Sequence, residues 1–424
     1  MKRKILLIYA WQDSSIRATT KEHLFSFRRY AHDIIYYANV LQGQFPEWLK
    51  KVDYDLIIFH TLFLANHWKG KVHFQKIAAR AAWAKESKAV KVMMPQDEFI
   101  NSDLYSDFIN EFKIDKVFTV APASVLPYIY RNVSQPSVQF ERILTGYLDE
   151  RRTRINCRRS RNKKERHVDI GYRTAGKPNV WFGRLGFMKQ TIADAVAPEA
   201  IRMGLKTDIS TDPEDVILGN RWYDFLLGCK YVIGCESGTS IVDPTGKIKE
   251  AVDQYVERYP TASFEEIEAQ CFPGADGMHV LNAISPRHLE VCATRSCQIL
   301  VEGDYDSILL PNIHYIPVKK DLSNLSSILA SLGNEARRLR IVENAYRDIV
   351  ASGKYTYRTM VHQIIEGSIS IRSREMPKRR VLDWLTFCFN LAYDMYGFYM
   401  AQKIKSLKRV VRMLIWPIRK SNLV

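Results

Sequence analysis

Short apolar runs, each long enough for one buried strand, alternate with stretches of helical spacing in the first part of the chain. This alternation is typical of a parallel sheet whose strands are joined by crossover helices. It predicts strands over residues 5–9, 55–60, 90–94 and 116–120. The first run follows a basic N-terminus, but it is shorter than the core of a signal peptide and no small-residue cleavage site follows it. We therefore interpret it as a strand.

A second series of apolar runs predicts strands over 168–172, 205–209, 230–234, 297–301 and 314–318. Because 424 residues exceed the size at which a single core stops growing, we predict two Rossmann-like α/β domains in tandem. The helical pattern of 321–367 is expected to close the second domain and lead the chain back to the first. The expected parts are an N-terminal domain over 1–150, a basic linker over 151–167, a C-terminal domain over 168–335, closing helices over 336–376 and a tail over 377–424.

The expected linker is polar, strongly cationic and without hydrophobic periodicity. A solvated linker or flexible loop is the interpretation that we favour. Contact with phosphate or lipid is one alternative. A nucleic-acid arm is a weaker one, because the segment contains no Phe, Tyr or Trp for base stacking.

The net charge of +16 implies an anionic partner, which can be nucleic acid, anionic lipid or a phosphorylated substrate. The 7 cysteines are scattered and show neither a CxxC pair nor zinc-like spacing. We therefore expect a reduced, cytoplasmic environment, without a disulfide framework and without a bound metal.

The densest group of polar residues begins where the strand over 230–234 ends. Ligands of parallel α/β sheets bind outside the carboxyl ends of strands, so this position favours a functional loop. Two carboxylates are candidates for the reacting centre (Glu236, Asp243), and two hydroxyls and a glycine suit phosphate oxygens (Ser237, Gly238, Ser240). A plain turn rich in Gly and Ser is the alternative. The charged segment 247–278 is expected to be an exposed helical insertion.

Residues 285–290 have the pattern of a helix start, with Ser285 as cap and Pro286 at the first helical position. A helix N-terminus attracts an anion, and Arg287 would reinforce it. Glu290 follows about one turn later, where its carboxylate can accept from both hydroxyls of a ribose. A surface helix start with incidental charges is the alternative.

Further candidates lie at other strand ends of the second domain. Arg173 and Lys189 follow its first strand and are expected to clamp a diphosphate. Asp208 ends the next strand and is expected to line the same cleft. Ordinary surface cations are the alternative for the two basic residues.

The acceptor side is expected on the N-terminal domain. Gln96, Asp97 and Glu98 follow the strand over 90–94 and can bind acceptor hydroxyls, with Asp97 as a general base or, equally, as a helix cap. His60 ends a predicted strand and is the histidine best placed for a catalytic base, and His23 is a second candidate. Each histidine alone is more often structural.

The order of these motifs resembles the donor-nucleotide region of GT-B glycosyltransferases, and more specifically a group of largely uncharacterised bacterial glycosyltransferase-like proteins. The resemblance covers roughly residues 1–335, with matches at 95–99, 172–173, 206–210, 219–222, 236–238, 243, 246 and 285–290. It implies two Rossmann-like domains facing a cleft, and a nucleotide-sugar that is bound as a substrate by the C-terminal domain. It also implies catalysis without a metal or other cofactor. Asn282 stands where many retaining members have Glu, which leaves the stereochemistry open.

The tail joins a stretch of nearly membrane length over 379–400 to a cationic segment with interleaved aliphatic residues. Asp383 and Asp394 would be costly inside a bilayer, so the tail is predicted to be an amphipathic interfacial anchor and not a membrane span. Packing on the two domains is the alternative.

These features favour transfer of a sugar from a nucleotide-sugar donor to a lipid-linked or cell-surface polysaccharide acceptor. The expected location is the inner face of the cytoplasmic membrane, with the tail on the anionic lipid surface. A sugar-nucleotide epimerase or a polymer phosphotransferase of the same fold is the main alternative. A nucleic-acid-binding protein is a weaker one.

Overall fold

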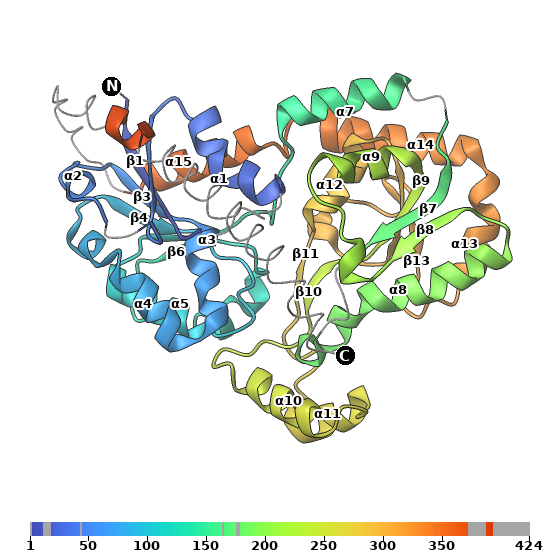
Figure 1. Cartoon of the computed structure of the whole chain (residues 1–424), viewed down its shortest axis with the longest axis horizontal. Coiled ribbons are helices and arrows are strands. Elements are labelled where there is room, and N and C mark those ends of the chain that lie inside the picture. Colours follow the sequence, from blue (N-terminus) through green and yellow to red (C-terminus); the bar gives the residue numbers. More distant parts are fainter. Residues whose placement is uncertain are drawn as a thin grey trace, which may run out of the picture.

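The computed structural model describes residues 2–11, 18–42, 45–162, 165–174, 179–371 and 387–392. These residues form two α/β domains that lie side by side (Figure 1). Each domain is built on a parallel sheet with helices packed against it. The predicted pair of Rossmann-like α/β domains in tandem is confirmed.

The N-terminal sheet has six parallel strands in the order β2-β1-β3-β4-β5-β6. Because helices cover the sheet on both faces, its inner strands are mainly apolar and buried, as in the fully buried β1. The strands are β1 (Lys4–Tyr9), β2 (Ile34–Asn39), β3 (Leu56–Phe59), β4 (Val90–Met93), β5 (Lys116–Thr119) and β6 (Gln139–Arg142). The helices are α1 (Ala18–Tyr30), α2 (Glu47–Lys50), α3 (Thr61–Leu64), α4 (Lys71–Ala79), α5 (Asp103–Phe112) and α6 (Leu126–Ile129).

The four strands predicted in this half are confirmed, and the two edge strands were missed. β6 is polar, with its two end residues exposed and its two central residues half-exposed, so it leaves no apolar run in the sequence. β2 is apolar, but it follows the aromatic-rich end of α1 directly and its pattern merges with that of the helix.

The C-terminal sheet has five parallel strands in the order β13-β12-β9-β7-β8, and all five were predicted. The strands are β7 (Val168–Arg173), β8 (Thr207–Ser210), β9 (Cys229–Gly234), β12 (Cys297–Val301) and β13 (Tyr315–Val318). The helices that pack on this sheet are α8 (Gly183–Arg202), α9 (Asn220–Gly228), α12 (Pro286–Ala293), α13 (Leu325–Ala330) and α14 (Glu335–Ala345). A separate antiparallel pair, β10 (Ser237–Thr239) and β11 (Leu281–Ala283), was not predicted.

The segment 151–167 joins the two domains, but the expectation of a flexible loop is wrong for most of its length, because Glu150–Asn162 form the helix α7, which lies along the C-terminal domain beside α9 and α12 (Figure 1). The carboxylate of Asp149 accepts a hydrogen bond from the backbone N of Arg152 at 2.9 Å and so satisfies a free donor of the first turn. Cys157 is buried against the C-terminal domain. Arginine is a strong helix former, so a capped and packed segment becomes helical without a regular apolar period.

The chain returns to the N-terminal domain in α15 (Tyr357–Ile369), which packs beside α1 on the first sheet (Figure 1). Where it crosses, Leu148 N donates to Tyr355 O at 2.8 Å, and Tyr357 N donates to Leu148 O at 3.0 Å. The outgoing and returning segments therefore lie side by side at the domain junction.

The segment 247–278 is helical, as expected, in α10 (Lys247–Arg258) and α11 (Phe264–Cys271). Its inner face is not exposed, however. Val252, Ile267 and Phe272 are buried in one cluster with residues of the N-terminal domain. The insertion therefore packs against both domains.

A backbone pairing joins the loop after β4 to the segment before α10. Asp243 N donates to Phe99 O at 2.6 Å, and Asn101 N donates to Asp243 O at 2.8 Å. A third bond runs from Asp103 N to Pro244 O at 3.0 Å. This pairing is a further connection between the two domains, far from α7 in the sequence.

Most of the predicted tail lies outside the described residues. Within 387–392, the side-chain amide of Asn390 accepts from Tyr37 N at 3.0 Å and donates to Tyr37 O at 2.8 Å, so it binds the open edge of β2. Phe387 packs edge-on against Tyr36. In the part of the chain that the structure describes, no helix has the length and apolar character needed to cross a membrane.

Arg166, from the predicted linker, is half-buried in the C-terminal domain instead of lying in solvent. Its guanidinium donates to several carbonyl oxygens at 2.7–3.4 Å, including those of Leu226 and Leu227 at the end of α9 and of Thr294 and Arg295 after α12. Burial lowers the pKa of this guanidinium to about 10. One side chain therefore satisfies the free carbonyls of two helix ends.

We expect Arg166→Gln to lower the free energy of unfolding by about 3 kcal/mol, because most of these buried carbonyls lose their only side-chain donor. Arg161→Gln, at an exposed position of α7, is the matched control and is expected to change it by less than about 0.5 kcal/mol. Urea denaturation of both variants measures the difference. Equal stability of the two variants would contradict this role of Arg166.

Candidate functional site

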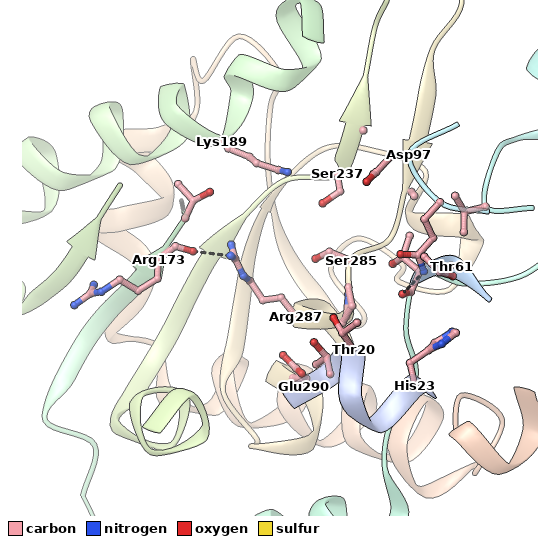
Figure 2. A pocket seen from close by; sticks show the side chains of 18 of the residues that line it. Thr20, His23, Thr61, Asp97, Arg173, Lys189, Ser237, Ser285, Arg287 and Glu290 are labelled. Atoms are coloured by element: carbon pink, nitrogen blue, oxygen red, sulfur yellow. Dashed lines mark hydrogen bonds between the residues drawn. The ribbon is translucent and has the colours of Figure 1, made fainter. Parts of the chain in front are cut away.

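A cavity of about 690 Å³ lies between the two domains. On the N-terminal side it is lined by residues that follow β3, β4 and β5 and by α1, and on the C-terminal side by residues at the ends of β7 and β9 and the starts of α8 and α12 (Figure 2). It therefore lies at the carboxyl ends of both parallel sheets, where such sheets bind ligands.

The helix start predicted at residues 285–290 is confirmed as the start of α12, and Ser285, Pro286, Arg287 and Glu290 all line the cavity. A Cβ atom on Gly146 would lie 2.6 Å from Pro286 Cγ, so the backbone before α7 packs closely on this helix start.

Arg287 is held between aromatic rings, with its guanidinium carbon 5.0 Å from the ring centre of Tyr172 and 5.6 Å from that of Trp222. It donates to the backbone oxygen of Arg173 at 2.5 Å. Figure 2 shows the ammonium group of Lys189, from α8, directed into the same space near Ser237. Two cations and the N-terminus of α12 therefore make this wall of the cavity electropositive.

The guanidinium of Arg173 points away from Arg287 (Figure 2). It donates to Tyr172 O and Asp208 O, each at 2.8 Å, and forms an ion pair with the carboxylate of Asp208. Asp208 is not one of the described residues that line the cavity. The structure thus places the backbone of Arg173 in the cavity wall, but turns away the cation that was predicted to clamp a diphosphate.

Glu290 is 5% exposed, and its carboxylate accepts from Trp222 Nε1 at 2.7 Å and from Tyr223 OH at 3.1 Å. Burial raises the pKa of this carboxyl, and the two hydrogen bonds oppose the rise. A carboxylate has about four acceptor positions, so two remain for the hydroxyls of a ribose. No sequence pattern indicated Tyr223, whereas Trp222 belongs to the segment 219–222, one of the matches on which the family resemblance rests.

Ser237 and Gly238 line the cavity as predicted from their place after β9. Gly238 has φ +133°, and a Cβ atom there would lie 1.8 Å from Leu281 O. Only glycine fits this approach of β10 to β11.

Glu236, predicted at the reacting centre, is not among the described residues that line the cavity. Its carboxylate accepts from Asn282 Nδ2 at 3.0 Å and from Tyr305 N at 2.8 Å. The carboxylate thus fixes the loop after β12, and Asn282 is bound to it instead of facing the cavity.

Asp243 and Ser240, two further predicted site residues, are also not among the described residues that line the cavity. Asp243 is buried and accepts from Lys249 N at 2.9 Å at the start of α10, which gives its carboxylate a structural contact. Ser240 donates to Asp276 at 2.5 Å and accepts from Leu185 N at 3.0 Å at the start of α8.

Gln96 and Asp97 line the cavity from the N-terminal side, and Figure 2 shows Asp97 facing Ser237. Gln96 Nε2 donates to Thr145 O at 3.0 Å. Asp97 has the left-handed φ of 56°, and Nε2 of the buried His67 lies 3.2 Å from its carbonyl oxygen. The alternative that Asp97 caps a helix is wrong, because no described helix begins there.

Glu98 points into the core instead of the cavity. Its carboxylate accepts from Thr119 Oγ1 at 2.5 Å, from Val120 N at 2.9 Å and from the hydroxyl of Tyr130. Complete burial raises the pKa of this carboxyl to about 7, against the lowering effect of these hydrogen bonds. Its place is therefore structural, and not the acceptor-side position that its neighbours in the sequence suggested.

His23 and His60 line the cavity, and their ring nitrogens are hydrogen-bonded to each other at 2.8 Å. The structure therefore brings together the two histidines that the sequence singled out.

Several lining residues were missed. Thr61 directly follows His60, so its position after the predicted strand over 55–60 could have indicated that it lines the cavity. Tyr357 enters from α15, far along the chain, and no local pattern predicts that. An aromatic wall formed by Trp68, Phe99 and Phe182 likewise arises from residues of both domains that are distant in sequence.

Among the described residues, no group of three or more His, Cys, Asp or Glu side chains is arranged to hold a metal ion.

No protein family profile and no curated protein matches the chain. Solved structures with a similar fold include Anabaena HepE in complex with UDP-glucose, at 11% identity and a TM-score of 0.46, with 87% of this chain and 100% of that chain covered. Sucrose-phosphate synthase from Thermosynechococcus elongatus has 11% identity and a TM-score of 0.46, with 86% and 98% covered. A DNA-modifying β-glucosyltransferase has 10% identity and a TM-score of 0.47, with 86% and 99% covered. Similarity this distant concerns the fold alone, so the proposal below rests on the residues of this chain.

The raised pKa of Glu98 predicts a pH dependence of stability. The carboxyl has a pKa of about 7 in the folded state, whereas the ordinary pKa of a Glu side chain is 4.5. Binding of the proton therefore stabilises the fold fully below pH 4.5. This contribution to the free energy of unfolding is lost as the pH rises towards 7. Relative to Glu98→Gln, the free energy of unfolding of the natural protein is expected to fall by up to about 1.4 kcal/mol per pH unit in this window. Urea denaturation across the window measures it.

Glu86→Gln, at an exposed position, is the matched control and is expected to follow the natural protein. A difference between the natural protein and Glu98→Gln that stays constant from about pH 4.5 to 8 would show that Glu98 does not titrate in this way.

Proposed function

We propose that the chain is a glycosyltransferase that moves a sugar from a nucleotide-sugar donor to a lipid-linked or cell-surface polysaccharide acceptor. The observation that carries the proposal is the asymmetry of the cavity between the domains. Its C-terminal wall holds Arg287 at the start of α12 and Lys189 in the second turn of α8, and its N-terminal wall holds Asp97. This arrangement suits a substrate that is anionic at one end and reacts at the other.

The donor fits the C-terminal wall. Lys189 and Arg287 would bind the diphosphate together with the hydroxyls of Ser237 and Ser285, and Glu290 would accept from the ribose hydroxyls. The carboxylate of Glu290 is held in place by Trp222 and Tyr223, so it is oriented before the donor binds.

The acceptor fits the N-terminal wall, where Thr61, Gln96 and Asp97 lie near the aromatic side chains of Trp68 and Phe182. In the transfer, an acceptor oxygen forms a bond to the anomeric carbon while the bond from that carbon to the phosphate oxygen breaks. The electron pair leaves with the diphosphate, where Lys189 and Arg287 stabilise the charge. The proton of the acceptor hydroxyl passes to Asp97.

A thermal-shift panel of UDP, GDP, dTDP, ADP and CMP sugars tests the donor site. One nucleotide class is expected to raise the melting temperature by several degrees at about 100-fold excess over its Kd. Glu290→Gln and Arg287→Gln are expected to lose most of this shift, because each removes a direct contact with the donor.

Arg202→Gln, at the far end of α8, is the matched control and is expected to keep the shift. If Glu290→Gln and the natural protein are stabilised equally, the ribose does not bind at Glu290. If no nucleotide sugar stabilises the natural protein, the proposed function is wrong.

A membrane contact is part of the proposal, and the described residues that support it lie on α7. Arg151, Arg154, Arg158 and Arg161 follow helical spacing on one face of this helix, and all four are exposed. None of them forms an ion pair with a carboxylate in the part of the chain that the structure describes. Ile155, 49% exposed, lies among them. A cationic face with an apolar centre suits an anionic lipid surface.

Replacing these four arginines by Gln is expected to weaken binding to vesicles that contain phosphatidylglycerol by up to about 10³-fold, since each Arg near such a surface contributes about 1 kcal/mol. Vesicle co-sedimentation measures the change. A control variant removes the same charge from exposed positions of the N-terminal domain: Lys51, Lys71, Lys76 and Lys88.

Equal loss in both variants would assign the binding to total charge and not to α7. Binding to duplex DNA that is as tight as binding to vesicles would favour the nucleic-acid alternative. Substitution is preferable to deletion after Met376, because deletion also removes Asn390 from the edge of β2.

A further inference from the structure

The histidine pair in the cavity has a hydrogen-bond pattern that fixes the position of its protons. His23 Nδ1 and His60 Nε2 are 2.8 Å apart, and the side chains are 5% and 0% exposed, respectively. His60 Nδ1 accepts from the backbone N of Leu62 at 3.1 Å. Both ring nitrogens of His60 are thus engaged, one by a group that can only donate.

The protons follow from this geometry. Because Leu62 N–H donates to His60 Nδ1, a neutral His60 carries its proton on Nε2 and donates it to His23 Nδ1. A neutral His23 then carries its own proton on Nε2. The hydrogen bonds therefore run in one direction, from Leu62 through His60 to His23.

The surroundings keep the pair neutral. Burial lowers the pKa of His23 to about 4, and burial together with the neighbouring His23 lowers that of His60 well below its ordinary value. A proton added to His23 Nδ1 would also face the proton on His60 Nε2. The ring of Tyr357, from α15, covers His23 edge-on at 5.8 Å between ring centres.

The end of this chain of hydrogen bonds has no acceptor. His23 Nε2 is buried and has no hydrogen-bond partner among the described residues, although the side chain lines the cavity. A buried N–H without a partner is unfavourable, so an acceptor oxygen at the cavity wall would be stabilised there.

We propose that His60 and His23 form a one-way hydrogen-bond relay that presents the Nε2–H of His23 to an oxygen of the bound substrate. His23 then positions the substrate as a donor and does not take its proton. This inference rests on the proposed function, in which the proton acceptor is Asp97, the carboxylate on the N-terminal wall of the cavity.

The protons can be observed without a substrate. In protein labelled with ¹⁵N-histidine, the ring resonances of His23 and His60, assigned with His23→Gln and His60→Gln, are expected to show the Nε2–H form in both residues and no titration between about pH 5.5 and 9. A proton on Nδ1 of either residue, or titration near the ordinary value, would overturn the relay. This result does not depend on whether the protein transfers sugars.

Kinetics with the donor found by thermal shift test the role in turnover. His23→Gln keeps an N–H donor and is expected to lose less than about 10-fold in kcat/KM, whereas His23→Leu is expected to lose about 10-fold or more. Both are expected to keep the shape of the pH profile. Asp97→Asn is expected to lose 10²- to 10⁴-fold, roughly the contribution of a proton acceptor.

The proposal would be refuted if His23→Gln lost the acidic limb of the pH profile and lost as much activity as Asp97→Asn. His23 would then be the base. If His23→Leu does not fold, the kinetics of His23→Gln and the histidine ring resonances of the natural protein test the proposal. If no nucleotide sugar binds, the proposed function fails while the resonances still test the relay.

Discussion

Three backbone hydrogen bonds between the loop after β4 and the segment before α10 hold the two walls of the cavity together. The loop carries Asp97, and the segment continues the one that carries Ser237 and Gly238, so each wall is fastened close to its functional side chains. Trp68, Trp181 and Phe99 pack beside this pairing, with ring centres of Trp68 and Trp181 5.6 Å apart. Rotation of one domain against the other would have to break these contacts, so the cavity is largely preformed.

Charge is distributed unevenly over the cavity. The buried carboxylate of Glu290 is stabilised by hydrogen bonds from two side chains and by the cations Arg287 and Arg152. The C-terminal wall nevertheless remains cationic, because Lys189 and the start of α12 add positive potential. The histidine pair on the opposite wall is neutral, so it does not attract an anionic ligand to that side of the cavity. Attraction is thus confined to one wall, which favours a single orientation of the bound donor.

The sequence predicted those parts of the molecule that depend on local pattern. Buried parallel strands leave apolar runs, and the Ser285–Pro286 start placed Arg287 and Glu290 at the carboxyl ends of strands before the sheet order was known. Side-chain direction in loops was not predictable. Glu236 and Asp243 lie close to Ser237 in the sequence, but their carboxylates turn to backbone N–H groups of other segments.

Helix α7 is an element that the sequence pattern did not predict. Its arginine-rich sequence lacks an apolar period, and its helical structure depends on Asp149 and on burial of Cys157 against another domain. Tyr357 and the aromatic wall depend on contacts between segments that are far apart in the chain. Such contacts are set by the tertiary fold and leave no signal in a short window of sequence.

The return of α15 to the first sheet has a consequence for synthesis. Residues of α15, including Met360, Val361 and Ile364, are buried in the same cluster as β1 and β3. That face of the N-terminal sheet, which α1 covers only in part, therefore stays incomplete until the ribosome has made the whole C-terminal domain, roughly 10–40 s later at 5–20 residues per second. During this time the N-terminal half is an unfinished domain with an apolar surface. Because α15 leaves the ribosome after the whole C-terminal domain, the C-terminal domain is the first that can complete its core. The two domains therefore do not fold in the order in which they are synthesised.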